Sequence, residues 1–181
     1  MPSTEEVLVL WNLFKQGDWS AYTTLYDHHF TLLNNYGYKF TKNVTLIEDA
    51  IQDLFIGLWT NRQNLSTPVS VKNYLYKSLR NILLRKAQNQ SRFVELSDDS
   101  SILFEISFDQ QIIVGEEEKE LQTKVNFFLT KLPPRQQEII FLRFYEDFDY
   151  QEIADIMGIT VSSAYKLLYK ALHSMEVALN K

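Results

Sequence analysis

The chain has 181 residues, of which 45% are hydrophobic and none is cysteine. This composition favours one or two packed domains over disorder, and it excludes disulfides, thiol nucleophiles and cysteine-bound zinc. The net charge of -5 is uneven: residues 1–88 carry +2, residues 89–119 carry −6 and residues 120–181 carry −1. The overall acidity is therefore a poor guide to the partners of either end of the chain.

No targeting or membrane signal is evident in the sequence. The N-terminal segment lacks the basic region and the long apolar run of a signal peptide. No stretch approaches the roughly 20 apolar residues that span a bilayer. We therefore expect a cytoplasmic protein without membrane insertion.

Helical periodicity dominates the first half of the chain. Two capping boxes, Ser3 with Glu6 and Thr45 with Glu48, mark the expected starts of two of its helices. The expected helices run from Ser3 to about Gln16, from Ser20 to about Phe40, from Thr45 onward, and from about Val71 to Gln88.

Residues 89–117 lose the helical period and hold most of the excess acidic charge. We interpret them as an acidic linker, at residues 91–117, between a first domain at 1–90 and a second at 118–181. Two interpretations of the linker stay open. Its composition favours a flexible connector, and the alternative is a segment that docks in part on the domains.

The helical pattern resumes near Glu116 and is expected to end at Lys131, before Pro133 and Pro134. A third capping box, Asp149 with Glu152, starts another short helix. The expected helices after Lys131 are 135–145, 149–158 and 161–179. The predicted fold class is all-α, with two small helical domains and a helix-turn-helix in a C-terminal four-helix unit.

The segment from Asp149 to Ala171 has helix-turn-helix spacing. Ala154 is small enough to let two helices approach, and Gly158 permits the positive φ of a tight turn. The candidate DNA-contacting residues of the last helix are Ser162, Ser163, Tyr165, Lys166, Tyr169 and Lys170. An ordinary αα-corner stays open as an alternative, because this helix has no arginine, the commonest direct reader of guanine.

Residues 66–94 contain six basic residues and no acidic one, with tyrosines among them. Aromatic rings stack on unpaired bases while cations hold phosphates, so this composition suits single-stranded DNA. An asparagine amide can also pair with an extruded base. The candidate residues are Lys72, Tyr74, Lys77, Arg80, Asn81 and Arg85. Composition alone favours the alternative, a solvated basic helix face with Tyr74 in the core.

The preceding helix has the opposite charge. Glu48, Asp49, Gln52 and Asp53 lie away from its apolar stripe and could dock a basic partner helix. A solvent-exposed face that complements the positive N-terminal end of the helix explains Glu48 and Asp49 equally well.

Four segments, in this order, resemble the extracytoplasmic-function (ECF) sigma factors of the sigma-70 family. They are GDWSAYTTLYDHHF, IEDAIQDLFIGLWTNR, SVKNYLYKSLRNILLRK and LPPRQQEIIFLRFYEDFDYQEIADIMGITVSSAYKLLYKAL. The resemblance spans nearly the whole chain. It implies a subunit of bacterial RNA polymerase that guides the enzyme to promoter DNA, with no catalytic residues and no cofactor of its own.

The resemblance also implies roles for particular residues. Asp49, Gln52, Asp53 and Phe55 would bind the β′ clamp helices of core RNA polymerase. Asn81 would help capture a flipped base of the −10 element.

The helix-turn-helix would enter the −35 major groove, with its other side on the β flap and Lys170 on phosphate. An anti-sigma factor is a typical partner, and the family's linker runs through the polymerase's RNA-exit region. Tyr74 stands where the family often has tryptophan, and Tyr165 and Leu167 stand where many members have basic or polar residues.

Two other classes compete with this interpretation. A stand-alone helix-turn-helix regulator would explain residues 149–171 but neither the basic segment nor the acidic face. A small enzyme is disfavoured because the three histidines, two of them at His28 and His29, have no metal-ligand spacing. The sequence also has no P-loop and no G-x-S-x-G motif.

Overall fold

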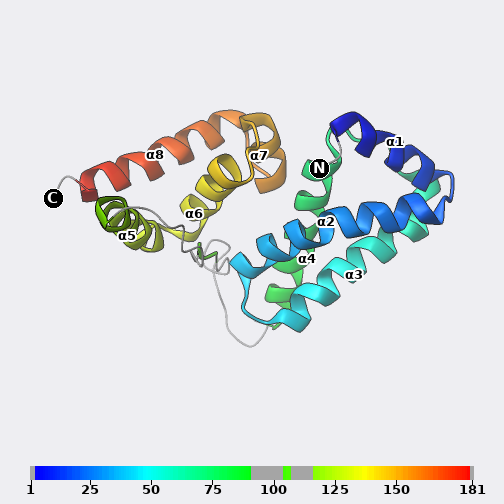
Figure 1. Ribbon diagram of the computed structural model, residues 1–181, viewed down its shortest axis with the longest axis horizontal. Helices are drawn as coiled ribbons and strands as arrows, with labels where there is room; N and C mark the ends of the chain where they lie inside the picture. Colours follow the sequence, from blue (N-terminus) through cyan, green and yellow to red (C-terminus); the bar gives the residue numbers. More distant parts are fainter. Residues whose placement is uncertain (1–2, 91–103, 107–115, 180–181) are drawn as a thin grey trace. The chain divides into compact units, whose positions relative to one another are not determined.

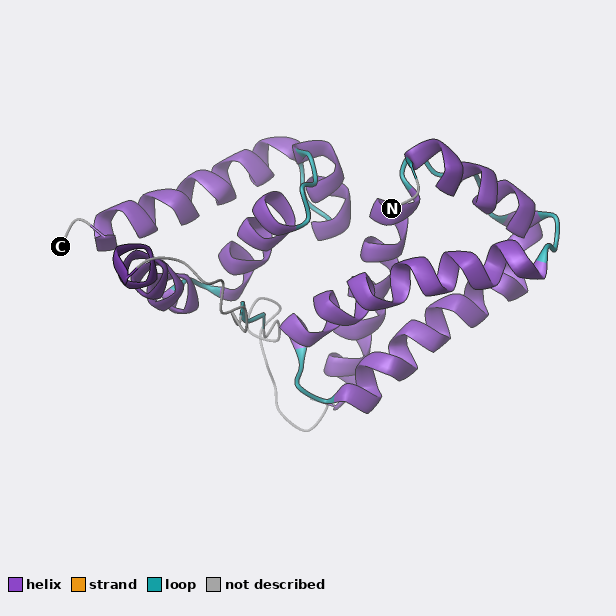
Figure 2. Cartoon of the chain, in the orientation of Figure 1, coloured by secondary structure: helices purple, strands orange, loops and turns teal. Residues whose placement is uncertain are grey.

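The computed structural model describes residues 3–90, 104–106 and 116–179 (Figure 1). In these ranges the regular structure is entirely helical (Figure 2), as the sequence predicts. The chain divides into two compact units, Met1–Ser101 and Ile102–Lys181. Among the helices described, none combines the length and the apolar character needed to cross a membrane.

The first unit is a bundle of four helices and a short 3₁₀ turn. The elements are α1 (Thr4–Lys15), α2 (Trp19–Phe40), α3 (Val44–Asn61), η1 (Arg62–Asn64) and α4 (Val71–Gln90). Helices α2, α3 and α4 pack against one another in pairs, and α1 packs on α2 and on the first part of the α4 surface. The core holds large rings, among them Tyr36 and Tyr76, which stack at 4.8 Å between α2 and α4.

The caps confirm one expected helix start and correct another. At α1, the Ser3 side chain accepts from the backbone N–H of Glu6 and the Glu6 carboxylate accepts from that of Ser3. At α3 the cap is Asn43, whose side chain accepts from the N–H of Leu46 at 3.1 Å. The helix therefore begins at Val44, and the capping box expected at Thr45 is wrong because Asn43 caps the helix first.

A glycine lets α2 and α3 approach closely. Gly37 is buried in α2, and a Cβ built on it would lie 2.5 Å from Cγ2 of Ile47, which is fully buried in α3. Gly57 of α3 is different, because a Cβ there would meet nothing within 4 Å. The two glycines thus provide a matched pair: one is required by packing and the other is not.

We expect opposite effects from the same substitution at these two sites. Gly37→Ala should lower the free energy of unfolding by about 1–3 kcal/mol, because the added methyl overpacks the contact with Ile47. Gly57→Ala should raise it by about 0.5–1 kcal/mol, since alanine is the better helix former. Urea unfolding of the two variants and the wild type measures both changes. A neutral Gly37→Ala would contradict the close approach.

A histidine is buried between the helices of this unit. His29 of α2 is only 2% exposed, and its Nδ1 lies 2.9 Å from the carbonyl oxygen of Leu25. Burial lowers the pKa of His29 to about 4, with smaller contributions in the same direction from His28 and Lys72. The imidazole is therefore neutral in the folded protein near pH 7 and donates from Nδ1 to Leu25.

This burial predicts a loss of stability in mild acid. The unfolded chain protonates His29 below about pH 6.5, whereas the folded chain does so only near pH 4. Between pH 7 and pH 5 the free energy of unfolding should fall by about 2 kcal/mol from this residue. His29→Gln keeps a donor for Leu25 and does not titrate, so its urea midpoint should change less over this range. Equal pH dependence in the two proteins would contradict the assignment.

The second unit is organised around its last helix. Its elements are α5 (Glu116–Lys131), α6 (Pro134–Ile140), η2 (Phe141–Tyr145), α7 (Tyr150–Met157) and α8 (Val161–Leu179). Helix α8 packs on α5, α6 and α7. The helix expected over 135–145 is divided, because its second part, η2, is a π-helical stretch. Within this stretch, Phe144 and Tyr145 are more than half exposed.

Two residues of the expected linker, Phe104 and Ile106, lie in the core of this unit. Phe104 and Ile106 are 2% and 1% exposed, and the ring of Phe104 is 5.9 Å from that of Phe141. Burying a side chain of this size stabilises a fold by about 1.5–3 kcal/mol. Docking, and not the flexible connector that composition favours, therefore describes residues 104–106. The other residues of the acidic linker lie outside the described ranges.

Candidate nucleic-acid interface

Helix α4 separates a core face from an outward face. Its core face buries Val71, Leu75, Tyr76, Leu79 and Leu83. The outward face holds four of the predicted DNA-contacting residues at spacings of three or four, namely Tyr74, Lys77, Asn81 and Arg85. We call these four residues the α4 face. Asn81 and Arg85 are exposed, while Tyr74 and Lys77 are half-buried.

The ring of Tyr74 packs against α1. Trp11 meets it edge to face at 5.4 Å, and the Trp11 indole N–H donates to the carbonyl of Ser66 at 3.3 Å. Trp11 itself is 1% exposed. Tyr74 is thus neither a core residue nor a free surface ring, because one edge is packed while part of the side chain reaches solvent.

Two predicted residues do not lie on the α4 face. Arg80 is 5% exposed and belongs to the buried side of the helix. Lys72 lies with its Nζ 5.5 Å from the ring of Tyr76, which is fully buried. The structure therefore does not present Arg80 to a phosphate as the sequence interpretation required, and Lys72 lies beside the core ring.

The predicted acidic face of α3 is exposed. Asp49, Gln52 and Asp53 all reach solvent, and we call these three residues the α3 acidic face. Asp53 pairs with Lys86 of α4 at 2.7 Å, and its side chain is still 57% exposed. This pair joins the acidic surface of one helix to the basic helix beside it.

Phe55 lies apart from these three residues, because it is 2% exposed. It lines a pocket of about 390 Å³ between α2 and α3. Tyr22, Tyr26, Gln52 and Ile56 also line this pocket, and Ile56 is 61% exposed. Phe55 can therefore shape a surface that a partner fills, but it offers little area of its own.

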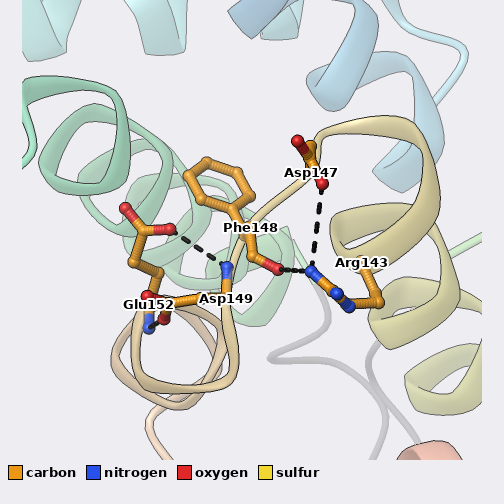
Figure 3. Close-up of polar contacts among 5 residues, drawn as sticks. All are labelled: Arg143, Asp147, Phe148, Asp149 and Glu152. Carbon is orange, nitrogen blue, oxygen red and sulfur yellow. Dashed lines mark hydrogen bonds and ion pairs between the residues drawn. The ribbon is translucent and has the colours of Figure 1, made fainter. Parts of the chain in front are cut away.

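The predicted helix-turn-helix is formed by α7 and α8. The third capping box is present: Asp149 accepts from the N–H of Glu152 at 2.8 Å, and Glu152 accepts from that of Asp149 at 3.1 Å (Figure 3). Helix α7 ends at Met157 and is capped by Gly158, whose φ of 65° is left-handed as expected. Ala154 is buried at the helix contact.

The turn before α7 is tied back to η2 by one arginine. Arg143 donates from Nη1 to the carbonyl of Phe148 at 3.0 Å, and the same atom lies 3.9 Å from the carboxylate of Asp147 (Figure 3). Asp147 has a positive φ of 57°. The guanidinium also lies 5.7 Å from the ring centre of Tyr150. These contacts fix the chain as it enters the first helix of the motif.

Tyr150 also contacts α8, the second helix of the motif. Its ring stacks on that of Tyr165 at 3.7 Å, and Tyr165 remains 53% exposed. The predicted DNA-contacting residues of α8 are all exposed; they are Ser162, Ser163, Tyr165, Lys166, Tyr169 and Lys170. The backbone of Ser163 takes part in capping the start of α8, because its N–H donates to Oγ1 of Thr160 at 3.1 Å.

Family models match both units. One, described as Sigma-70 region 2, covers residues 25–93, and another, described as Sigma-70, region 4, covers residues 125–175. The chain belongs to the sigma-70 family. It falls in the ECF group, and its function is that of an RNA polymerase sigma factor, which is a regulatory subunit and not an enzyme.

Relatives from Bacillus subtilis (strain 168) align with most of this sigma factor. The RNA polymerase sigma factor SigV is 28% identical over 144 residues, which are 80% of this chain and 82% of SigV. The ECF RNA polymerase sigma factor SigW is 20% identical over 168 residues, covering 89% of this chain and 90% of SigW.

Solved structures share the fold. RpoE from Bartonella quintana, in complex with the anti-sigma factor NepR, has a TM-score of 0.63 at 19% identity and covers 87% of this chain and 96% of its own. CnrH, in complex with the cytosolic domain of CnrY, has a TM-score of 0.61 at 16% identity and covers 96% of each chain.

The sigma-family interpretation of the sequence missed the residues that support these surfaces. Trp11, Arg143 and Tyr150 each position a candidate DNA-contacting side chain or the helix that carries it. Tyr150 follows the capping residue Asp149 and lies fifteen positions before Tyr165, so neither periodicity nor spacing connects the two rings.

Proposed function

We propose that this sigma factor recognises a promoter with two separate surfaces while core RNA polymerase holds both. The α4 face grips the melted strand of the −10 element, and α8 enters the major groove of the −35 element. The observation that carries this proposal is the α4 face itself, which sets a held aromatic ring, two cations and an exposed amide along one side of a helix.

The chemistry of the α4 face suits an unpaired strand. A base can stack on the exposed part of Tyr74, while Lys77 and Arg85 neutralise phosphates. The Asn81 amide can pair with the edge of a base that has left the helix stack. Because Arg80 and Lys72 lie toward the core, we do not give Arg80 a DNA contact and we give Lys72 at most a peripheral one.

We assign the α3 acidic face to core polymerase. Asp49, Gln52 and Asp53 present carboxylates and an amide to solvent along one side of α3, which favours a basic partner helix such as the β′ clamp helices. The pocket lined by Phe55 and Ile56 lies on the same helix and adds an apolar edge to this surface. In the second unit, the surface that does not face the −35 groove is assigned to the β flap of core polymerase.

The recognition helix is weakly basic, and this fits a subunit that acts only within a larger complex. Lys166 and Lys170 are its two exposed cations, and Lys170 is assigned to phosphate. With a net charge of -5 the free chain gains little from counterion release. Two weak DNA contacts become effective together once polymerase holds both, because the second contact then forms at a high effective concentration.

We further propose an anti-sigma factor as a regulatory partner. The support is that RpoE and CnrH, which share this fold, were solved in complex with an anti-sigma factor and with the cytosolic domain of CnrY. The competing proposal, a stand-alone helix-turn-helix regulator, leaves the α4 face and the α3 acidic face without a role. Co-purification with core polymerase separates the two proposals.

Run-off transcription tests the proposed function directly. The purified chain is added to core RNA polymerase with a library of genomic promoter fragments, and the 5′ ends of the transcripts are mapped. We expect starts at a set of fragments that share two sequence elements. Failure to join core polymerase at low salt, or joining without any new start site, would reject the proposal.

A charge exchange tests the docking role of the α3 acidic face. Asp53→Arg should weaken binding to core polymerase by at least about tenfold, because it places a cation where a basic partner docks. Combining it with Lys86→Glu restores an opposite-charge pair within the sigma factor, but binding should stay weak. The stability of each variant should change by less than about 1 kcal/mol, as expected for an exposed ion pair.

The control for this exchange is Lys86→Glu alone, which breaks the same ion pair and retains Asp53. We expect it to bind core polymerase nearly as well as the wild type in a fluorescence-anisotropy titration. Wild-type affinity in Asp53→Arg would remove Asp53 from the docking surface.

A second pair of variants tests the −10 role of Asn81. Asn81→Ala should slow strand opening by about tenfold while initial promoter binding changes little, because the amide contacts the base only after it is extruded. Permanganate reactivity of unpaired thymines measures opening. Gln88→Ala, an exposed amide two turns further along α4, should behave as the wild type. Equal opening rates in all three proteins would contradict the assignment.

A further inference from the structure

The segment Phe104–Ile106, which we call the anchor, is built into the second unit by side-chain and backbone contacts. Phe104 and Ile106 are almost fully buried, and the ring of Phe104 lies 5.9 Å from that of Phe141 at the start of η2. The residue between them, Glu105, is exposed. This alternation of buried and exposed side chains is that of an extended segment lying against a core.

A buried glutamine recognises the backbone of the anchor. The N–H of Ile106 donates to Oε1 of Gln137 at 2.9 Å, and Nε2 of Gln137 donates to the carbonyl of Leu132 at 2.9 Å. Gln137 is 4% exposed. Its amide therefore bridges the anchor to the end of α5, and a buried N–H that would otherwise lack a partner is satisfied.

The anchor shortens the chain that joins the two units. Thirteen residues separate Gln90, the end of α4, from Phe104, and a chain of that length spans at most about 50 Å. Without the anchor, the count runs from Gln90 to Glu116, at the start of α5. Twenty-five residues would then intervene, with a reach of about 90 Å.

We infer that Phe104, Ile106 and Gln137 are specificity determinants for the spacing between the two promoter elements. The inference rests on the proposed function, in which each unit contacts one element. Each base pair added to the spacer moves the −35 element by about 3.4 Å and turns it by about 34° relative to the −10 element. A short tether restricts how far the second unit can follow, so it disfavours spacers of the wrong length.

Two matched insertions test this inference. The same six-residue Gly-Ser segment is inserted either between Ser100 and Ser101, before the anchor, or between Gln110 and Gln111, after it. The first lengthens the tether, and the second lengthens only the chain between the anchor and α5. Each protein is combined with core polymerase and promoters whose spacers differ by single base pairs, and transcript yields are compared.

We expect only the insertion before the anchor to change the spacer profile. It should lower the yield at the wild-type optimum about twofold, as effective concentration falls with tether length. It should also raise the relative yield from spacers two base pairs too long or too short. The insertion after the anchor should reproduce the wild-type profile. Equal profiles for the two insertions, whether both shifted or both unchanged, would overturn the inference.

A separate measurement tests the anchor without polymerase. Hydrogen exchange of the Ile106 amide in the free full-length chain should be slow, and Phe104→Ala should accelerate it at least tenfold. Exchange at the rate of an unstructured peptide would overturn the anchor even if transcription were normal. A protected amide in a protein that starts no transcripts would instead reject the proposed function, so the two failures are distinguishable.

Discussion

The packing and the candidate DNA surface of the first unit both depend on α4, which buries one side and exposes the other. The same helix that completes the core through Leu75, Leu79 and Leu83 must display the α4 face to solvent, and its 3.6-residue period permits both. Each outward residue is thereby set at a fixed height by the packing beneath it. The surface that we assign to melted DNA is the reverse side of a buried contact, and Trp11 adds a packing contact to Tyr74.

The sequence predicted the helices well because their signals are local. The capping boxes at Ser3 and Asp149 and the left-handed Gly158 each act within a few residues, and all are present. The start of α3 was misplaced because two residues of capping type, Asn43 and Thr45, lie close together. Sequence pattern does not decide which of them caps the helix.

The candidate site was predicted less completely, because the side of a helix on which a residue lies depends on tertiary packing. Composition groups Arg80 with the other basic residues of α4. Its position on the helix nevertheless places it among buried residues. Phe55 is similarly buried. No periodic signal in the sequence predicts that Phe104 and Ile106 dock. Their docking depends on Gln137, which lies more than thirty residues later in the chain.

The tryptophans give the two units different spectroscopic properties. Trp11, Trp19 and Trp59, the three in the sequence, all belong to the first unit, where Trp19 and Trp59 meet edge to face at 5.0 Å. Indole emission therefore reports on this unit alone, whereas far-ultraviolet circular dichroism reports on the helices of both. Comparing the two signals during denaturation would show whether the halves of the protein melt as one cooperative body or independently.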